Sequence, residues 1–584
     1  MTDQRIAIDR LRQAMARADI DAYLIPRGDA FSGEEVQLCD ERLAWISGFT
    51  GSAGLAIVTM DEAVLFSDGR YTIQMQNQTN ETWQCKVMPG ETPSGWIAAH
   101  LNGRQVGFDP MLMTMADHQK LKTALVDKNI TLVGIAENLI DQIWIDRPHP
   151  LITAPWDVDP SYHGQTRTAK MKAVISAMAD AGADQLLICD PTELAWLLNI
   201  RAADLSHTPV MLAFAILSHD GKVTLFYDAD APLPIDQSQI RIVPAKELIP
   251  YLEQCKDLSV WLDPAQTPIA LADALTLGGA NIIKTGHPLQ MMKAVKNSVE
   301  QDGFRSAHCR DAVAMIRFLA WIDAEAPIRV ITEIEANDKL QFFRQQVDGY
   351  LGDSFGAISA SGEHGAIVHY RATIESNAPL QRNNLYLIDS GGQYHDATTD
   401  ITRCIVIGAP DQDMVFCYTH VLKAHIALDR QIFPKGTTGI QLDAITRQPM
   451  WNVGLDYAHG TGHGVGCALS VHEGPVSLSP RSGKALHEGM VLSNEPGYYR
   501  DGCFGIRLEN LVIVVAKDNN MLGFEHVTWV PFDRRLIDLT LLSPTEREWL
   551  NQYHQDIRDK IMPAIKGLGD AGVLDWLMAQ TAPL

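Results

Sequence analysis

Hydrophobic and polar positions along the first 300 residues follow both helical and strand spacing. Ile8, Leu11 and Met15 recur at the three-to-four-residue spacing of an amphipathic helix. The segments 54–68 and 212–228 each place apolar runs on both sides of a polar turn, which predicts two strands joined by a turn. Helices and strands that alternate in this way are typical of α/β domains.

The same order of elements occurs twice in this part of the chain. The first copy contains ADIDAYLIPRGD (18–29) and ERLAWISGF (41–49). The second contains AGADQLLICDPT (181–192) and TELAWLLNI (192–200). Each pair follows an amphipathic helix and precedes one of the two strand–turn–strand segments. The repeat therefore predicts two copies of one α/β fold.

These patterns predict three domains. The first two are the α/β copies, residues 1–158 and 159–295, separated by the proline-rich segment 146–160. The third, residues 296–584, mixes helices and strands without strict alternation, which predicts an α+β domain. A C-terminal tail is expected from about residue 525.

Capping signals mark the helices of the third domain. SVEQ (298–301) and TEIE (332–335) have the form of a capping box, and SPTE (543–546) opens one more helix in the tail. Strands are expected from 366 to 407 and again after 490, with a further helix near 414–430. The whole chain is thus predicted to combine α/β and α+β architecture.

Composition narrows the class of protein. Hydrophobic residues make up 46% and charged residues 20% of the 584 positions, as in globular proteins. The formal net charge of −23 argues against nucleic acid or an anionic membrane as the main partner.

The cysteines and the N-terminus predict a cytoplasmic protein. The nine cysteines are scattered, and no pair has Cys-x-x-Cys spacing, so neither a zinc knuckle nor a disulfide framework is indicated. The first helix lacks the apolar core of a signal peptide. No stretch approaches the length needed to span a bilayer.

Two aspartates flank a strand-to-strand connection in the third domain. An apolar run ends at Asp389, a Gly-Gly turn follows, and Asp400 enters the next apolar run. Pairing of the two strands could bring both carboxylates together. An aspartate that ends a strand is more often a turn former, so this pair alone is weak evidence of a site.

Two histidines and two glutamates extend the constellation. His459 and His463 lie in the glycine-rich segment HGTGHGVG, whose glycines allow a backbone that other residues would not. Glu495 and Glu509 each end an apolar run. A buried carboxylate needs a partner, and four carboxylates that converge with an imidazole repel one another unless cations neutralise them. Oxygen-rich donors with one imidazole suit manganese best, with cobalt or zinc as alternatives.

The sequence resembles the pita-bread metallopeptidases, whose metal ligands occur in the order Asp, Asp, His, Glu, Glu. The resemblance covers nearly the whole chain and is greatest to the three-domain cytosolic type of aminopeptidase P (Xaa-Pro aminopeptidase), which has two creatinase-type N-terminal domains before the catalytic domain. One departure is YRATIE (370–375), where the family more usually has Tyr-Ala-Pro. The resemblance is carried by KAVKNSVE (293–300), GAIVHY (365–370), ATTDITR (397–403), LDYAHGTGHGVG (455–466), VHEGP (471–475), EPGYY (495–499), FGIRLEN (504–510) and EREWLNQYHQDIRD (546–559).

The resemblance implies a two-metal site. His463 and Glu495 would bind one ion and Asp389 the other. Asp400 and Glu509 would bridge the two ions.

The resemblance also implies the roles of other residues near the metals. His369, His459 and His472 would line the site without binding metal, and Arg507 would orient the carboxylates. Two ions that share a water can lower its pKa and deliver hydroxide to a peptide carbonyl. Glu495 would accept the proton of that water, and His472 would donate a hydrogen bond to the oxyanion.

The implied activity is removal of the first residue from peptides whose second residue is proline, by a homodimeric enzyme. The nearest alternative is a prolidase, which shares the site and cleaves Xaa-Pro dipeptides. A non-catalytic peptide-binding protein and a creatinase-like amidinohydrolase share the fold. All five ligand positions are filled in this chain, which argues against both of these.

Overall fold

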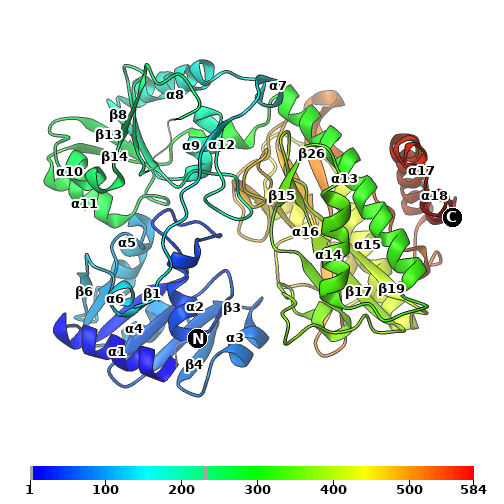
Figure 1. Ribbon diagram of the computed structural model, residues 1–584, viewed down its shortest axis with the longest axis horizontal. Helices are drawn as coiled ribbons and strands as arrows, with labels where there is room; N and C mark the ends of the chain where they lie inside the picture. Colours follow the sequence, from blue (N-terminus) through cyan, green and yellow to red (C-terminus); the bar gives the residue numbers. More distant parts are fainter. Residues whose placement is uncertain (1–3, 229–232) are drawn as a thin grey trace. The chain divides into compact units, whose positions relative to one another are not determined.

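The computed structural model describes residues 4–228 and 233–584, which form two compact units (Figure 1). The first unit comprises most of the described chain up to Leu289. The second comprises Gln290–Leu584 together with two short segments, Val158–Gly164 and Ser206–Pro209. The predicted domain boundaries near residues 158 and 295 stay predictions.

The first unit contains two six-stranded sheets with the same strand order. One sheet runs β4-β3-β2-β1-β5-β6, and the other runs β12-β11-β10-β8-β13-β14. In each sheet the central three-strand meander is antiparallel and the outer pairings are parallel. The predicted duplication is therefore confirmed at the level of strand order and direction. The strands of this unit are β1 (Ala22–Pro26), β2 (Leu55–Thr59), β3 (Ala63–Asp68), β4 (Trp83–Met88), β5 (Gln105–Phe108), β6 (Thr131–Gly134), β7 (Trp156–Asp157), β8 (Gln185–Ile188), β9 (Ile200–Arg201), β10 (Phe214–Ser218), β11 (Val223–Phe226), β12 (Ile240–Val243), β13 (Ser259–Leu262) and β14 (Asn281–Lys284).

Amphipathic helices cover these sheets. The first helix buries Ile8, Leu11 and Met15 in one hydrophobic cluster with residues of the first sheet, as the spacing of these residues predicts. The second sheet has its own buried cluster, centred on Leu187 and Ile216. The helices of this unit are α1 (Gln4–Arg17), α2 (Arg42–Ser47), α3 (Thr72–Gln78), α4 (Pro93–His100), α5 (Met115–Ala124), α6 (Leu139–Ile143), α8 (Arg167–Ala181), α9 (Pro191–Leu198), α10 (Leu248–Leu252) and α11 (Ile269–Leu277).

The second unit is α+β, as predicted. Its main sheets have the orders β16-β17-β19 and β20-β27-β26-β23-β21-β22, with two-stranded sheets β15-β18 and β24-β25 beside them. The strands are β15 (Tyr350–Asp353), β16 (Ile358–Ser361), β17 (Asn384–Ser390), β18 (Gly392–Tyr394), β19 (Ile401–Ile407), β20 (Ile432–Pro434), β21 (Gly462–Gly464), β22 (Glu473–Leu478), β23 (Val491–Asn494), β24 (Gly497–Arg500), β25 (Phe504–Arg507), β26 (Asn510–Lys517) and β27 (Met521–His526).

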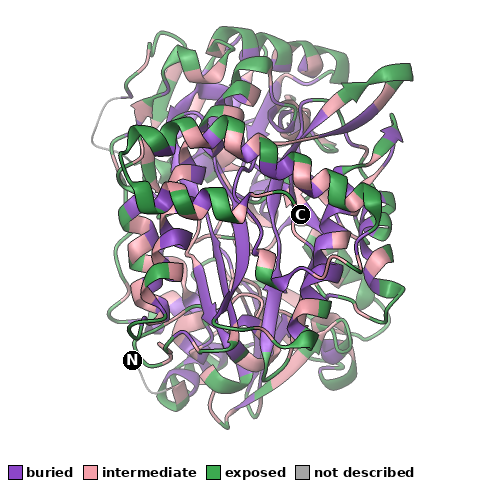
Figure 2. Cartoon of the chain, turned by 90° about the vertical axis from the view of Figure 1, so that its right-hand side faces the viewer, coloured by how far each residue is buried: buried purple, intermediate pink, exposed green. Residues whose placement is uncertain are grey.

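Helices pack on the outer faces of these sheets. Figure 2 shows strands coloured as buried between helices whose outer sides are coloured as exposed. The core joins α13, α14, α15 and the C-terminal helices to β17 and β19. The helices of this unit are α7 (Pro160–His163), α12 (Leu289–Ala294, which contains the boundary between the units), α13 (Ser298–Glu325), α14 (Glu333–Arg344), α15 (Gln412–Asp429), α16 (Gly439–Trp451), α17 (Pro544–Gly567) and α18 (Ala571–Gln580).

Two local predictions in this unit need correction. The capping box of α13 is formed by Asn297 and Glu300, one residue before the predicted Ser298, because the Asn297 amide oxygen accepts from the first helical N–H groups. The segment after Ala366 is a loop rather than a strand, and strand structure resumes at Asn384. At α14 the Thr332 side chain accepts from the Glu335 N–H, which is one half of the predicted box, and α17 begins directly after Ser543, where SPTE predicts a helix.

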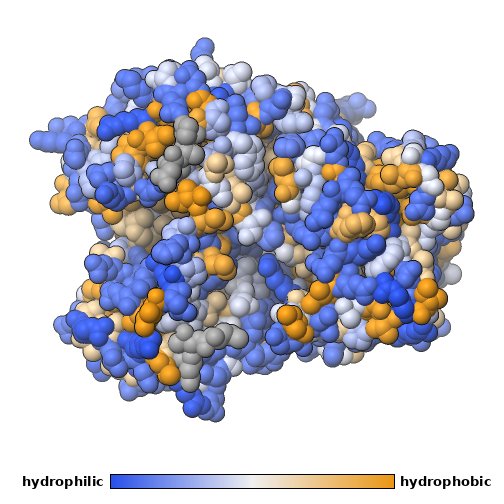
Figure 3. Space-filling model, viewed as in Figure 1, coloured by the Kyte–Doolittle hydropathy of each residue, from blue (hydrophilic) through white to orange (hydrophobic). Residues whose placement is uncertain are grey.

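The surface mixes polar and apolar residues. On the face drawn in Figure 3, hydrophilic residues predominate and apolar residues are scattered among them. None of the described helices has both the length and the hydropathy that a bilayer-spanning segment requires.

Candidate metal centre

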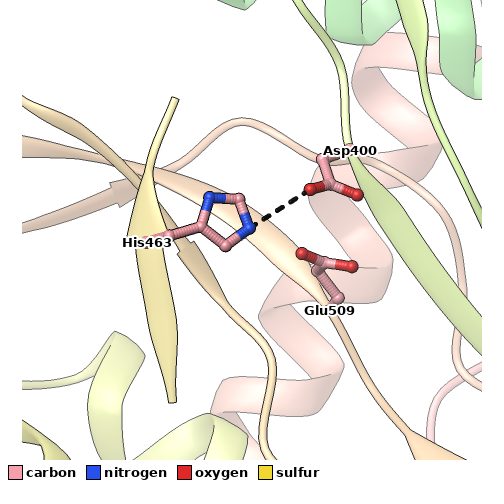
Figure 4. A group of neighbouring side chains, drawn as sticks. All are labelled: Asp400, His463 and Glu509. Carbon is pink, nitrogen blue, oxygen red and sulfur yellow. Dashed lines mark ion pairs between the residues drawn. The ribbon is translucent and has the colours of Figure 1, made fainter. Parts of the chain in front are cut away.

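Three predicted ligands converge in the second unit. Asp400, His463 and Glu509 each offer a ligand atom, and these atoms lie within 4.8 Å of one another (Figure 4). Asp400 immediately precedes β19, His463 is the central residue of β21, and Glu509 lies between β25 and β26. Three segments that are distant in sequence thus meet at one point.

Strand register explains the position of the two aspartates. The antiparallel pair β17–β19 places Asp389 opposite Thr402. Because side chains alternate along a strand, Asp400 and Thr402 point to the same face. Both carboxylates therefore face the same region, as pairing of the two strands predicts.

Backbone hydrogen bonds attach the two glutamates to the same region. The Glu495 N–H donates to the Thr461 carbonyl at 2.8 Å. The Glu509 N–H donates to the Thr402 carbonyl at 3.2 Å, and the Thr402 hydroxyl donates to Glu509 Oε2 at 2.7 Å. His463 Nε2 lies 3.5 Å from Asp400 Oδ2 and 3.6 Å from Glu495 Oε1.

One oxygen of each of three carboxylates is buried and has no hydrogen-bond partner among residues 4–228 and 233–584. These atoms are Asp389 Oδ1, Asp400 Oδ1 and Glu509 Oε1. A buried anionic oxygen without a donor is costly, and a cation is the partner that satisfies several such oxygens at once. The donor set therefore fits a metal site.

Burial and mutual repulsion raise the pKa values of these carboxyls. Burial, followed by the charge of Asp389, holds the pKa of Asp400 well above its usual range. Burial, followed by the charge of Asp400, does the same for the pKa of Glu509. Burial raises the pKa of Glu495 to about 7. These carboxyl groups therefore bind either protons or metal ions more readily than exposed carboxyl groups do.

A hydrogen bond of the imidazole orients His463 toward the carboxylates. Its Nδ1 lies 2.9 Å from the Gly464 carbonyl, which can only accept, so Nδ1 carries the proton. Nε2 faces Asp400 Oδ2 and Glu495 Oε1. This is the usual arrangement of a histidine that ligates a metal.

Known proteins match the chain over its whole length. Residues 302–516 match metallopeptidase family M24, and residues 7–143 and 146–300 each match a creatinase/prolidase N-terminal domain. A probable Xaa-Pro aminopeptidase P of Laccaria bicolor is 38% identical, with 100% of this chain and 94% of that protein covered. The chain belongs to the Xaa-Pro aminopeptidase P group of family M24.

Other proteins similar to this M24 peptidase are also named as aminopeptidases of this group. Aminopeptidase P2 of Arabidopsis thaliana is 36% identical over 100% of this chain and 89% of its own length. The X-prolyl aminopeptidase of Caenorhabditis elegans, described as a cytosolic enzyme with a di-nuclear active site, superposes with a TM-score of 0.95 at 32% identity and full coverage of both chains. Residues 520–584 match the C-terminal region of peptidase M24. The predicted family and fold are confirmed.

A chain of hydrogen bonds joins His459 to Asp389 in this M24 peptidase. His459 Nδ1 lies 2.7 Å from the Gly460 carbonyl, so its Nε2 accepts from the Tyr499 hydroxyl at 2.8 Å. Arg507 Nη1 donates to the same hydroxyl at 2.7 Å, and Arg507 Nη2 donates to Asp389 Oδ2 at 2.6 Å. Both nitrogens of His459 are therefore hydrogen-bonded to the Gly460 carbonyl and the Tyr499 hydroxyl, whereas Nε2 of His463 faces carboxylates.

His472 lies at the exposed edge of the site. Its ring meets that of His463 edge-on, with centroids 4.3 Å apart. The next residue, Glu473, is buried, and its carboxylate pairs with Lys293 and Lys296. This buried ion pair fixes the backbone from which His472 projects.

His369 lies, half-buried, in the loop that follows Ala366, and it is not one of the three residues that form the ligand cluster. Glu333 holds this loop. It accepts from His364 Nδ1 and the Tyr370 hydroxyl, each at 2.8 Å, and from the Ala378 N–H at 3.0 Å. The segment Tyr370-Arg371-Ala372 differs from the Tyr-Ala-Pro that is usual in the family. Its tyrosine holds the loop in place through the hydrogen bond to Glu333.

Several residues that support the ligands were not predicted. Tyr499 belongs to the EPGYY segment but was not assigned a role, and Thr402 could have been found from its two-residue spacing to Asp400. Arg447, on α16, holds the histidine loop by donating to the carbonyls of Tyr457 and His459, each at 2.6 Å. No sequence spacing relates Arg447 to that loop, so only the fold identifies it.

The raised pKa values predict how pH affects the metal-free protein. The pKa of Glu495 is about 7 in the fold and 4.5 as its ordinary value. Its contribution to stability is therefore fully present below pH 4.5 and is lost as pH rises through 7. For a shift of this size the loss amounts to roughly 3 kcal/mol.

Bound cations remove this loss because they neutralise the carboxylates. We expect the rise in Tm that manganese produces to increase between about pH 5 and about pH 8, measured by calorimetry on metal-free and metal-loaded protein. A rise in Tm that is the same across this range would contradict the electrostatic account.

Proposed function

We propose that this enzyme removes the first residue from peptides whose second residue is proline, with the help of two divalent metal ions. The observation that carries the proposal is the cluster of Asp400, His463 and Glu509, together with the buried oxygens of Asp389, Asp400 and Glu509 that have no hydrogen-bond partner in the described part of the chain. The full-length similarity to Xaa-Pro aminopeptidases supports the substrate class.

The geometry supports a division of the ligands between two ions. His463 and Glu495, whose side chains approach within 3.6 Å, would hold one ion, and Asp389 would hold the other. Asp400 and Glu509 would bridge the two. Four carboxylates and one imidazole suit manganese best, with cobalt and zinc as alternatives.

When bound, the ions would supply the Lewis acidity that lowers the pKa of a shared water and delivers it as hydroxide. The side chains provide the remaining functions. Glu495 would accept the proton of that water and pass it to the leaving nitrogen. His472 is exposed at the edge of the site, where it can donate to the oxyanion. Arg507 fixes Asp389, and His459 and His369 would line the site.

Proline in the second position makes a particular demand. Its nitrogen carries no hydrogen and its ring fixes the direction of the chain, so a site for ordinary peptides misplaces the scissile bond. A prolidase must also position the bond that precedes proline, but its substrates are dipeptides. The duplicated N-terminal domains and the coverage of the relatives by the full chain favour the aminopeptidase.

One assay separates these activities. With manganese present, we expect release of the first residue from Xaa-Pro-Pro and from longer Xaa-Pro peptides, and almost no cleavage of Xaa-Ala-Ala, when products are identified by mass spectrometry. Cleavage confined to Xaa-Pro dipeptides would show a prolidase instead. A matched Ala-Ala-Pro peptide controls for recognition of proline at another position.

We also propose a cytoplasmic homodimer. The nine free cysteines suit a reducing compartment, and the C. elegans relative is described as cytosolic. The dimer rests on the family resemblance, and the molecular mass in solution tests it.

A further inference from the structure

Arg403 is completely buried and forms no ion pair within the described part of the chain. It follows Thr402 in β19, so its side chain points to the face opposite to that of Thr402 and Asp400. A buried guanidinium without a carboxylate is unusual, because desolvation of its charge must be balanced by other acceptors. In Arg403 these acceptors are backbone carbonyls and an amide oxygen.

The hydrogen bonds of Arg403 centre on the backbone at Glu509. Its Nη1 donates to the Glu509 carbonyl at 2.6 Å and to the Thr402 carbonyl at 2.9 Å. Its Nη2 donates to Asn510 Oδ1 and to the Val530 carbonyl, each at 2.7 Å. One side chain thus joins β19 to the strand that begins directly after Glu509.

The C-terminal helix α17 completes this group. The Tyr553 hydroxyl lies 3.1 Å from Arg403 Nη2 and donates to the carbonyls of Thr528 and Val530 at 2.9 and 3.0 Å. The Arg403 guanidinium also lies over the Phe532 ring, 4.5 Å from its centroid. Phe532 and Tyr553 both belong to the C-terminal region, residues 520–584.

These contacts leave Glu509 little freedom. Its N–H is bonded to the Thr402 carbonyl, its carbonyl to Arg403 and its Oε2 to the Thr402 hydroxyl. Oε1 has no hydrogen-bond partner in the part of the chain that the structure describes. A carboxylate fixed at three points presents its remaining oxygen in one direction, which is what a preorganised ligand requires.

We propose that Arg403 and Tyr553 are positioning residues for the metal centre, and that the C-terminal region stabilises bound metal through them. The inference rests on the proposed function, since it takes Glu509 as a metal ligand. It assigns a role to the C-terminal region: α17 supports the back of the site and contributes no ligand.

The test uses the full-length protein and measures metal affinity rather than activity. Arg403→Lys keeps the charge but loses the planar fork that joins Glu509 to Asn510 and Val530. Tyr553→Phe removes only the hydroxyl. Tyr23→Phe is the matched control, because it removes a buried hydroxyl that accepts from the Leu139 N–H in the first unit. The apparent Kd for manganese is measured by competition with a chelator, beside the Tm of each metal-free variant.

Loss of a residue that orients a metal ligand typically weakens metal binding about 10–100-fold. We expect Arg403→Lys to weaken manganese binding at least about tenfold and Tyr553→Phe about threefold or more. Tyr23→Phe should lower Tm without changing the Kd. Should Arg403→Lys fail to fold, Tyr553→Phe alone decides the outcome.

Glu509→Gln separates failure of this inference from failure of the proposed function. If it loses metal while Arg403→Lys and Tyr553→Phe bind manganese within about twofold of the unmodified protein, the positioning role is wrong and the metal site stands. If Glu509→Gln keeps both ions with unchanged affinity, the ligand assignment is wrong and the inference fails with it.

Discussion

Replacement of His463 by alanine is expected to remove bound metal and abolish peptidase activity together. His463 Nδ1 donates to the Gly464 carbonyl, and Nε2 faces Asp400 and Glu495. Its loss leaves a gap in the coordination of one ion. Elemental analysis of the purified variant, beside turnover of an Xaa-Pro-Pro peptide, measures both effects.

His459→Phe is the matched control because His459 lies four residues away in the same glycine-rich loop. Both of its nitrogens are hydrogen-bonded within the protein, so this variant should keep two ions per chain. Retention of both ions by His463→Ala, or loss of metal from His459→Phe alone, would contradict the assignment.

Replacement of His472 by alanine is expected to lower kcat about a hundredfold or more, with both ions retained. The ring of His472 lies edge-on to that of His463 at the exposed side of the site, outside the ligand cluster. A donor that acts only on the transition state changes kcat far more than KM. Steady-state kinetics and elemental analysis of the same sample measure the two properties.

The comparison for His472 is His219→Ala, which alters an exposed histidine in the first unit. It should leave kcat, KM and metal content unchanged. A metal-depleted His472→Ala protein, or one with altered KM and normal kcat, would assign His472 to ligand binding or substrate binding instead.

Much of the fold could be predicted because periodicity reflects burial directly. The apolar residues of α1 and the two strand–turn–strand segments lie where their spacing places them. The repeated landmarks predict the duplication because each copy keeps the same strand order. The start of α13 was predicted less well. Asn297 and Ser298 can both cap a helix, and the structure has Asn297 at the N-cap.

The ligand cluster could be predicted in part from the residues themselves. Asp389 and Asp400 flank one strand connection, so pairing of β17 with β19 brings them to one face. The glycine-rich histidine loop and the two glutamates that end apolar runs also marked candidate ligands, but the choice of His463 and the role of each residue follow from the resemblance. They could not be derived from spacing, because His463 and Glu509 reach the cluster from strands far away in the chain.

The supporting residues could not be predicted for a physical reason. Arg403 and Arg447 act on carbonyl oxygens, which every residue has, so no side-chain pattern in the sequence marks their partners. Tyr553 reaches the back of Glu509 only because α17 packs there. Interactions of this kind depend on tertiary contacts between distant segments.

A crystal structure of the manganese-loaded enzyme, with an anomalous difference map collected at the manganese edge, tests the central claim most directly. The account predicts two peaks in the second unit, one between His463 Nε2 and Glu495, the other at Asp389, with Asp400 and Glu509 in contact with both. A single peak, or peaks that the carboxylates of Asp400 and Glu509 do not bridge, would contradict it.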